Sequence, residues 1–238
     1  MTKERHAQAE KSVTALSPRL IREMARDIVS EARRGAGLLP RKDDGASVKE
    51  LAKKTLGRVD IGIDHIKDEE LTRLIQELAR ARKRPDEKKT VHVFLAGEGR
   101  SGLVAKAFGM RLVHLGITAH NIDESTTPAK RRGDLLLLFS GSGTTKSCIH
   151  QAESAKAVGA RVGAITSFPD SELGKLADFT VKIEGRQENE VRREGQDPVH
   201  PMGTRFELTL RVVTDALVEC LMVKLDVSEK MMKLHHHN

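Results

Sequence analysis

The sequence predicts an α/β fold, a three-layer α-β-α sandwich around a five-stranded parallel sheet. Short apolar runs alternate with helical patterns along the chain at the spacing of β-α-β units. One run, DLLLLF at 134–139, is apolar without interruption, which is typical of a strand buried on both faces. Two of the runs lead through glycine-rich turns directly into helical patterns. These three observations together favour a parallel sheet over an antiparallel one.

The predicted elements follow one another in a regular order. The apolar runs predict strands at 91–96, 117–122, 134–139, 161–166 and 179–183. Helical patterns follow at 103–115, 146–158, 171–177 and 204–223. Gly116 and Gly159 stand after two of these helices, where glycine commonly ends a helix. The last helix is apolar on more than one face, which indicates burial on both sides and a subunit interface.

Residues 1–47 form an N-terminal extension, and residues 48–238 form the domain. In the extension, Leu16 to Ala32 carries apolar residues at every fourth position, which predicts a helix, and a glycine-containing linker follows. The domain opens with helical patterns at 48–66, with a break near 57–62, and at 68–79.

Composition narrows the classes of partner. The net charge of +7 favours anionic ligands such as sugar phosphates, nucleotides or nucleic acid. The chain has no Trp or Tyr and only six Phe, so it offers no aromatic platform for bases, and we expect no nucleic-acid partner. Cys148 and Cys220 lack metal-ligand spacing, so we expect buried thiols in a reducing cytoplasm and no metal site. No apolar run approaches the length of a membrane span, so we expect no membrane contact.

The turn SGSGTT, which follows the third predicted strand, is the main candidate for ligand binding. Four hydroxyl residues, Ser140, Ser142, Thr144 and Thr145, stand within six positions between a strand and a helix. Glycines let backbone N–H groups approach an anion, hydroxyls donate further bonds, and the helix N-terminus adds partial positive charge. The turn therefore predicts a phosphate site. The alternative is a tight turn with a Ser/Thr cap, but a cap needs only one hydroxyl.

The first predicted strand ends in a second glycine turn, GEGRSG at 97–102. The pattern GxGxxG between a strand and a helix matches the dinucleotide fingerprint, and Asp123 stands where a ribose-binding acid is expected. The motif is short, however, and Arg100 and Ser101 suit a small polar ligand better than a buried pyrophosphate. Because both turns follow strands of one parallel sheet, they lie on the same edge and favour a compact phosphorylated sugar.

Four separated motifs resemble the sugar isomerase (SIS) domain and, within it, the 6-phospho-3-hexuloisomerase family. They are AGEGRSGLVAKAFGMRLVHLG at 96–116, ESTTP at 124–128, AITSFP at 164–169 and PMGTRFE at 201–207. The resemblance covers about residues 48–238. It implies the SIS fold with its flavodoxin-like topology, and a homotetramer with active sites near subunit boundaries.

The resemblance also implies a reaction. Members of the family interconvert 3-hexulose 6-phosphate and fructose 6-phosphate in the ribulose monophosphate pathway, and a 3-hexulose-6-phosphate synthase is then a candidate partner. The reaction moves a carbonyl between adjacent carbons through an enediolate, so it needs a base and donors for the oxyanion but no cofactor. Two alternatives stay open, a sugar-phosphate sensor built on an SIS module and, less favoured, an NAD-dependent oxidoreductase.

Site residues follow from the same resemblance. The implied phosphate and substrate site consists of Ser140, Ser142, Thr144 and Thr145, with Gly99, Arg100 and Ser101 from the first turn. Glu207 ends the PMGTRFE motif and is the implied base; alternatively it forms a capping box with Thr204. Glu124 follows the second strand and either binds the sugar or caps its own loop.

The chain ends in His235-His236-His237-Asn238, which resembles the histidine pair near the end of family members. This likeness implies that His235 assists ring opening or proton transfer, and a truncated purification tag is the alternative. Two positions depart from the family pattern. Glu98 brings a negative charge to the first turn, and Arg205 replaces an apolar residue beside the implied base.

Overall fold

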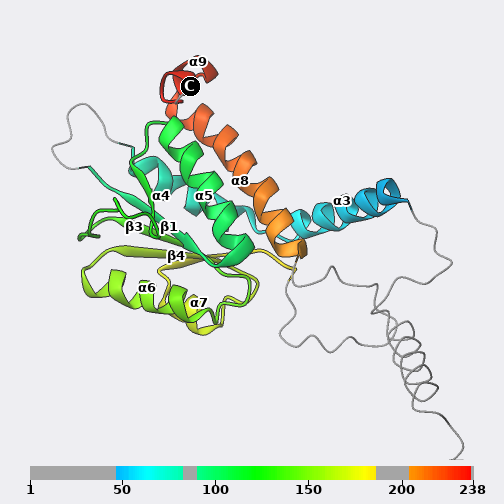
Figure 1. The fold of residues 1–238 in the computed structure, drawn as a ribbon, viewed down its shortest axis with the longest axis horizontal. Coiled ribbons are helices and arrows are strands. Elements are labelled where there is room, and N and C mark those ends of the chain that lie inside the picture. Colours follow the sequence, from blue (N-terminus) through cyan, green and yellow to red (C-terminus); the bar gives the residue numbers. More distant parts are fainter. Residues whose placement is uncertain (1–46, 83–89, 186–203, 237–238) are drawn as a thin grey trace, which may run out of the picture. The chain divides into compact units, whose positions relative to one another are not determined.

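The sheet is parallel throughout and has five strands (Figure 1). The computed structural model describes residues 47–82, 90–185 and 204–236, and apart from Ser47 and Val48 these belong to one compact unit. The strands are β1 (Val93–Gly97), β2 (Ala119–Asn121), β3 (Leu135–Phe139), β4 (Arg161–Thr166) and β5 (Phe179–Lys182). Their order is β2-β1-β3-β4-β5, which confirms the predicted five-stranded parallel sheet.

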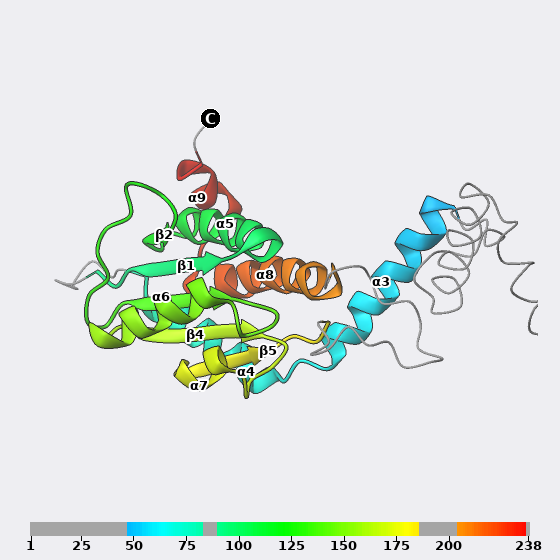
Figure 2. The same cartoon turned by 60° about the horizontal axis from the view of Figure 1, so that its bottom comes forward.

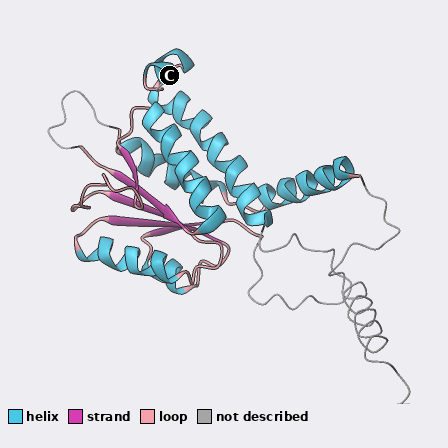
Figure 3. Cartoon of the chain, viewed as in Figure 1, coloured by secondary structure: helices cyan, strands magenta, loops and turns pink. Residues whose placement is uncertain are grey.

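Helices cover both faces of this sheet (Figures 1 and 2). One face carries α4 (Asp68–Arg80), α5 (Gly99–His114) and α8 (Thr204–Leu225), and the other carries α6 (Lys146–Ala157) and α7 (Glu172–Leu176). Two further helices are α3 (Val48–Asp64), which precedes α4, and α9 (Glu229–Leu234), which follows α8. Figure 3 shows the strands between the two helical layers, so the predicted three-layer sandwich is confirmed.

The central strand β3 belongs to both halves of the core. All five of its residues are buried. Successive residues of a strand point to opposite faces, so Leu135, Leu137 and Phe139 pack in the cluster beneath α5 and α8. Leu136 and Leu138 pack in the cluster beneath α6. A strand covered on both faces has no solvent side, which is why its sequence shows no polar alternation.

Three elements differ from the prediction. α3 passes through Gly57 without the predicted break, because the position is open, with no atom within 4 Å of an added Cβ, and a helix tolerates one glycine at about 1 kcal/mol. β2 is short because it pairs only with β1, through Ala119–Asn121. α9 is absent from the predicted elements, and Ser228 caps it by accepting the N–H of Met231.

The cysteine expectation holds at one position and is wrong at the other. Cys148 is buried, and burial raises the pKa of its thiol to about 11. Cys220, near the C-terminal end of α8, is exposed. The expected helix at 16–32 lies outside the described residues. Within the described ranges, no helix combines the length and the apolar character needed to cross a membrane.

A pair of histidines lies at the β1–β2 side of the sheet. His92 Nδ1 and His120 Nε2 are 2.9 Å apart, and both rings stack near Phe94. One nitrogen must donate and the other accept, so the bond requires at least one neutral ring. Burial, and then the charge of His92, lower the pKa of His120 below its ordinary value.

This lowered pKa predicts a loss of stability in mild acid. Because the unfolded chain binds the proton of His120 more tightly than the folded chain does, the contribution is present above the unfolded pKa of about 6.5 and is lost as pH falls through the folded pKa. We expect the Tm to fall between about pH 7.5 and about pH 5.5, and to fall less in His120→Gln. Part of the dependence of Tm on pH should remain in His120→Gln, because burial also lowers the pKa of His114. The exposed His150→Gln is the control, and equal slopes in all three proteins by circular dichroism would contradict the assignment.

Candidate functional site

The two glycine turns leave the sheet side by side. β1 and β3 pair in register, so Gly97 lies opposite Phe139, and the turns 97–102 and 140–145 start from the same edge. The chain continues from β1 to β2 on one side and from β3 to β4 on the other, so the strand order reverses between β1 and β3. Open parallel sheets bind ligands at this position, at the carboxyl ends of the strands. The prediction that both turns share one edge is confirmed.

The first turn depends on close backbone contact. An added Cβ on Gly102 would lie 2.4 Å from the carbonyl oxygen of Gly97, and one on Gly97 would lie 2.8 Å from that of Phe139. Gly99 has φ 54°, in the left-handed region that favours glycine. α5 therefore begins directly at the sheet edge, with Ser101 buried in its first turn.

The second turn is closed by its own hydroxyl groups. Ser140 Oγ lies 2.8 Å from Thr145 Oγ1 and accepts the N–H of Gly143 at 3.2 Å. Ser142 Oγ accepts both the N–H and the hydroxyl of Thr144, at 3.3 Å and 3.2 Å. Ser140 is buried, whereas Ser142 and Thr145 are half-buried and Thr144 is exposed. Ser140 thus supports the turn, and the other three hydroxyls are the ones a ligand can reach.

Glu98 links the first turn to α6. Its Oε1 accepts the hydroxyl of Ser147, the second residue of α6, at 2.7 Å. The carboxylate therefore points toward the second turn and lies at the N-terminus of α6, where negative charge is stabilised. A phosphate bound at this end of α6 would meet the charge of Glu98.

The first turn of α8 adjoins the first glycine turn. Arg100 NH1 donates to Thr204 Oγ1 at 2.8 Å and so ties the start of α8 to the start of α5. Glu207 lies in the same turn of α8, and only 7% of its surface is exposed. The structure therefore brings the implied base, Arg100 and Ser101 to neighbouring helix ends at the carboxyl edge.

Glu124 lies apart from this group. It follows the edge strand β2, on the other side of β1 from β3. Its Oε1 accepts Nδ2 of Asn121 at 2.9 Å, and its N–H donates to the Asn121 carbonyl at 3.1 Å. These contacts are those of a loop acid that holds its own turn.

A cavity of about 150 Å³ opens between the ends of β1 and β2 and the start of α6. Glu98, Lys106, Asp123 and Ser147 contribute to its wall. Asp123 forms an ion pair with Lys106, and the hydrogen bond from Lys106 lowers the pKa of Asp123. The acid that the dinucleotide interpretation assigns to a ribose is therefore engaged by a side chain of α5.

His235 lies at the opposite end of α5. Its Nδ1 is 3.1 Å from the carbonyl oxygen of His114, the last residue of that helix. α5 has 16 residues, so its two ends are about 24 Å apart. Within one chain, the structure does not bring His235 together with the glycine turns. No group of three His, Cys, Asp or Glu side chains within the described ranges could hold a metal ion.

Two members of this edge are missing from the sequence-based predictions. Ser147 continues the run of hydroxyls that starts at Ser140, and extending the motif into the first turn of α6 would have found it. No sequence pattern points to Lys106, because its partner Asp123 is brought to it only by the crossover from α5 to β2.

Comparisons with known proteins agree with this geometry. The SIS domain model matches residues 87–197. A Bacillus subtilis (strain 168) protein named 3-hexulose-6-phosphate isomerase is 42% identical over 146 residues, which are 61% of this chain and 78% of that protein. A Mycobacterium gastri protein of the same name is 43% identical over 150 residues, 61% of this chain and 72% of that protein. The crystal structure of a Methanococcus jannaschii protein, with an inferred molecular function of 3-hexulose-6-phosphate isomerase, has a TM-score of 0.65 at 30% identity and covers 79% of this chain and 98% of that one.

The glycine contact in the first turn predicts a specific intolerance. Gly102→Ala would place a methyl group against the Gly97 carbonyl, so we expect the free energy of unfolding to fall by about 2–3 kcal/mol. Gly57→Ala is the control, because its site is open and helical, and we expect a gain of up to about 1 kcal/mol. Urea unfolding measures both, and losses of similar size would contradict the proposed packing of the turn.

Proposed function

The chain belongs to the SIS-domain family of the 3-hexulose-6-phosphate isomerases, and we propose that it interconverts 3-hexulose 6-phosphate and fructose 6-phosphate in the ribulose monophosphate pathway. The observation that carries the proposal is the side-by-side position of two hydroxyl-bearing turns at the reversal of strand order. A compact sugar phosphate needs donors for its phosphate and polar groups for its carbons within one small site, and this edge provides both.

In this proposal the phosphate binds at the second turn. Ser142, Thr144 and Thr145 donate from their hydroxyls, and the first N–H groups of α6 add partial positive charge. Binding exchanges the hydroxyl–hydroxyl bonds within the turn for bonds to phosphate oxygens, which are stronger because the acceptor is charged. The backbone of Gly99 and the side chains of Arg100 and Ser101 face the sugar from the first turn.

The chemistry requires a proton to move between two neighbouring carbons. In the direction from fructose 6-phosphate, the Glu207 carboxylate removes the proton from C3, and the electron pair forms a C2–C3 double bond with negative charge on the C2 oxygen. The hydroxyl proton of C3 passes to that oxygen, and the proton on Glu207 returns to C2, which leaves the carbonyl at C3. The free N–H groups at a helix N-terminus can donate hydrogen bonds that stabilise the developing negative charge on the C2 oxygen.

We assign His235 to the site of a second copy of the chain. Its position at the far end of α5 separates it from the turns of its own subunit. The outer side of α5 also exposes apolar side chains, with Leu103 67% and Met110 50% exposed, which supports an assembly of several subunits. We propose a cytoplasmic homotetramer whose substrate is supplied by a 3-hexulose-6-phosphate synthase.

A coupled assay tests the activity. The protein is mixed with fructose 6-phosphate and a 3-hexulose-6-phosphate lyase, which breaks the C1–C2 bond of the 3-ketone and releases formaldehyde. We expect formaldehyde only when both proteins are present. Saturable binding of fructose 6-phosphate without turnover would favour the sensor, and saturable NADH fluorescence would favour the oxidoreductase.

Removal of the proposed base tests the catalytic assignment of Glu207. Glu207→Gln keeps the shape of the side chain but cannot accept a proton, so we expect kcat to fall by about 10³-fold with binding of fructose 6-phosphate retained. Glu219→Gln, exposed on the same helix, should retain wild-type kcat. Near-full activity of Glu207→Gln would remove Glu207 from the base role.

The phosphate turn predicts a different kinetic pattern. Ser142→Ala removes one hydrogen bond to a charged phosphate, so we expect KM to rise by about tenfold or more. Because the phosphate is bound equally in ground and transition states, kcat should change by less than about threefold. Ser154→Ala, exposed on α6, should leave both constants unchanged. A loss confined to kcat in Ser142→Ala would contradict phosphate binding at this turn.

A further inference from the structure

We propose that an ion pair between Glu184 and Arg205 positions the first turn of α8, and with it Glu207, for the isomerisation. The inference rests on the proposed function, because it takes Glu207 as the base. Glu184 and Arg205 are positioning residues in this account. They act through the helix turn that carries the base.

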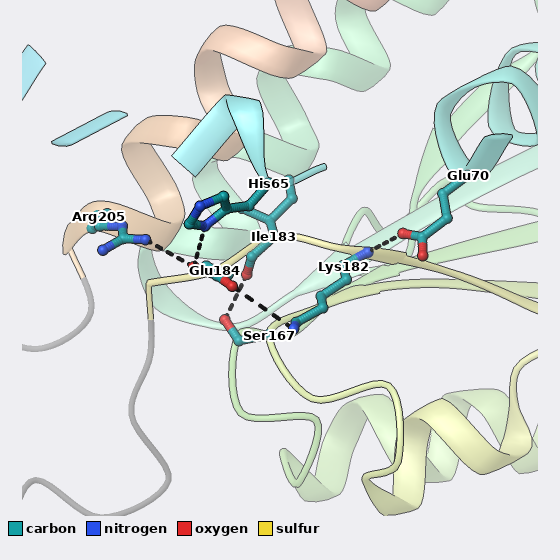
Figure 4. Close-up of polar contacts among 7 residues, drawn as sticks. All are labelled: His65, Glu70, Ser167, Lys182, Ile183, Glu184 and Arg205. Carbon is teal, nitrogen blue, oxygen red and sulfur yellow. Dashed lines mark hydrogen bonds and ion pairs between the residues drawn. The ribbon is translucent and has the colours of Figure 1, made fainter. Parts of the chain in front are cut away.

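Glu184, just after the end of β5, contacts three basic side chains (Figure 4). Its Oε2 accepts from His65 Nδ1 at 2.8 Å and from Arg205 NH2 at 3.2 Å, and its Oε1 lies 3.8 Å from Lys182 Nζ. His65 follows α3, Lys182 ends β5, and Arg205 is the second residue of α8. The hydrogen bond from His65, followed by the charges around it, outweighs burial and lowers the pKa of Glu184. Glu184 is therefore ionised at neutral pH and connects three elements.

Hydrogen bonds from two neighbouring elements hold the backbone just before Glu184. The N–H of Lys182 donates to Glu70 Oε2 at 2.6 Å, from α4 (Figure 4). The carbonyl of Ile183 accepts the hydroxyl of Ser167 at 2.7 Å, from the end of β4. The residue before Glu184 and the last residue of β5 are thus both anchored. The Glu184 carboxylate consequently extends from a backbone segment that is held in place.

The strand end and the helix start also meet directly. An added Cβ on Gly185 would lie 2.5 Å from the backbone N of Phe206, so only glycine fits between them. The ion pair and this backbone contact involve consecutive residues on each side, Glu184 and Gly185 against Arg205 and Phe206. These two contacts together fix the position of the first turn of α8 along the helix axis and its rotation about that axis.

Arg205 has little freedom to take another place. Its side chain is 26% exposed, and its Nε is buried with no hydrogen-bond partner in the described part of the chain. Gly62 of α3 lies close on one side, since an added Cβ there would be 3.7 Å from that Nε. Without the charge of Glu184, this largely buried cation lacks its carboxylate partner and must turn toward water. That movement would release the turn at Arg205.

Glu207 is the next acid in the same turn. Arg100 holds Thr204 from α5, Glu184 holds Arg205 from β5, and the helix transmits both constraints to Glu207. The phosphate turn is built separately, between β3 and α6. Loosening α8 should therefore misplace the base and leave phosphate binding intact. A displacement of about 1 Å in a reacting group costs up to about 10²-fold in rate.

The test compares Glu184→Gln, Arg205→Met and the double variant in the coupled assay. We expect each single variant to lose about 10- to 100-fold in kcat, with KM within about threefold of wild type. The double variant should be no slower than the slower single variant, because both changes remove one interaction. Asp215→Asn is the matched control. It breaks the Arg211–Asp215 pair, which lies on the same helix at the same 3.2 Å, and should keep wild-type kcat.

Hydrogen–deuterium exchange gives a readout that does not depend on activity. Amides of 205–209 should exchange faster in both single variants, while those of α6 stay as in wild type. Wild-type kcat or unchanged exchange in the single variants, or additive losses in the double variant, would overturn the inference. An inactive wild type would overturn the proposed function together with it. An active wild type, an inactive Glu207→Gln and a fully active Glu184→Gln would overturn the positioning role alone.

Discussion

The contact on which the site depends is the approach of the Gly102 backbone to the Gly97 carbonyl. A side chain at Gly102 would lie 2.4 Å from that oxygen, so α5 can start at the end of β1 only because both positions are glycine. Gly97 lies opposite Phe139, the last residue of β3, and the second turn begins there. The packing of the buried leucines of β3 fixes the position of that strand in the core, and with it the point at which the strand ends. Packing thereby determines where both turns lie.

In the proposed function, binding and chemistry are carried by different parts of this frame. The hydroxyl turn is closed by bonds within itself and belongs to β3 and α6. Glu207 belongs to α8, whose first turn is held from α5 through Arg100 and from β5 through Glu184. Changes in the hydroxyl turn should therefore alter mainly affinity, and changes around α8 should alter mainly rate. Glu98 of the first turn accepts a hydrogen bond from Ser147 at the N-terminus of α6.

Local pattern predicts what local forces determine. The apolar run 134–139 predicts β3 because full burial needs it, and two glycine turns after parallel strands must share an edge. The pairs Glu98–Ser147 and Glu184–Arg205 join residues 49 and 21 positions apart, and no periodicity encodes them. The break predicted near Gly57 is wrong because the residue lies on an open helix face. The likeness of the last four residues to family members draws attention to His235, but it does not predict that this residue lies at the far end of α5.

The most direct measurement is the position at which solvent deuterium enters fructose 6-phosphate. The protein is incubated with the sugar phosphate in D₂O, and proton NMR follows each carbon-bound hydrogen. A carbonyl shift between C2 and C3 through an enediolate predicts deuterium at C3, together with the signals of the 3-ketone. Deuterium at C1, which marks a shift between C1 and C2, or no exchange at any carbon, would contradict the account.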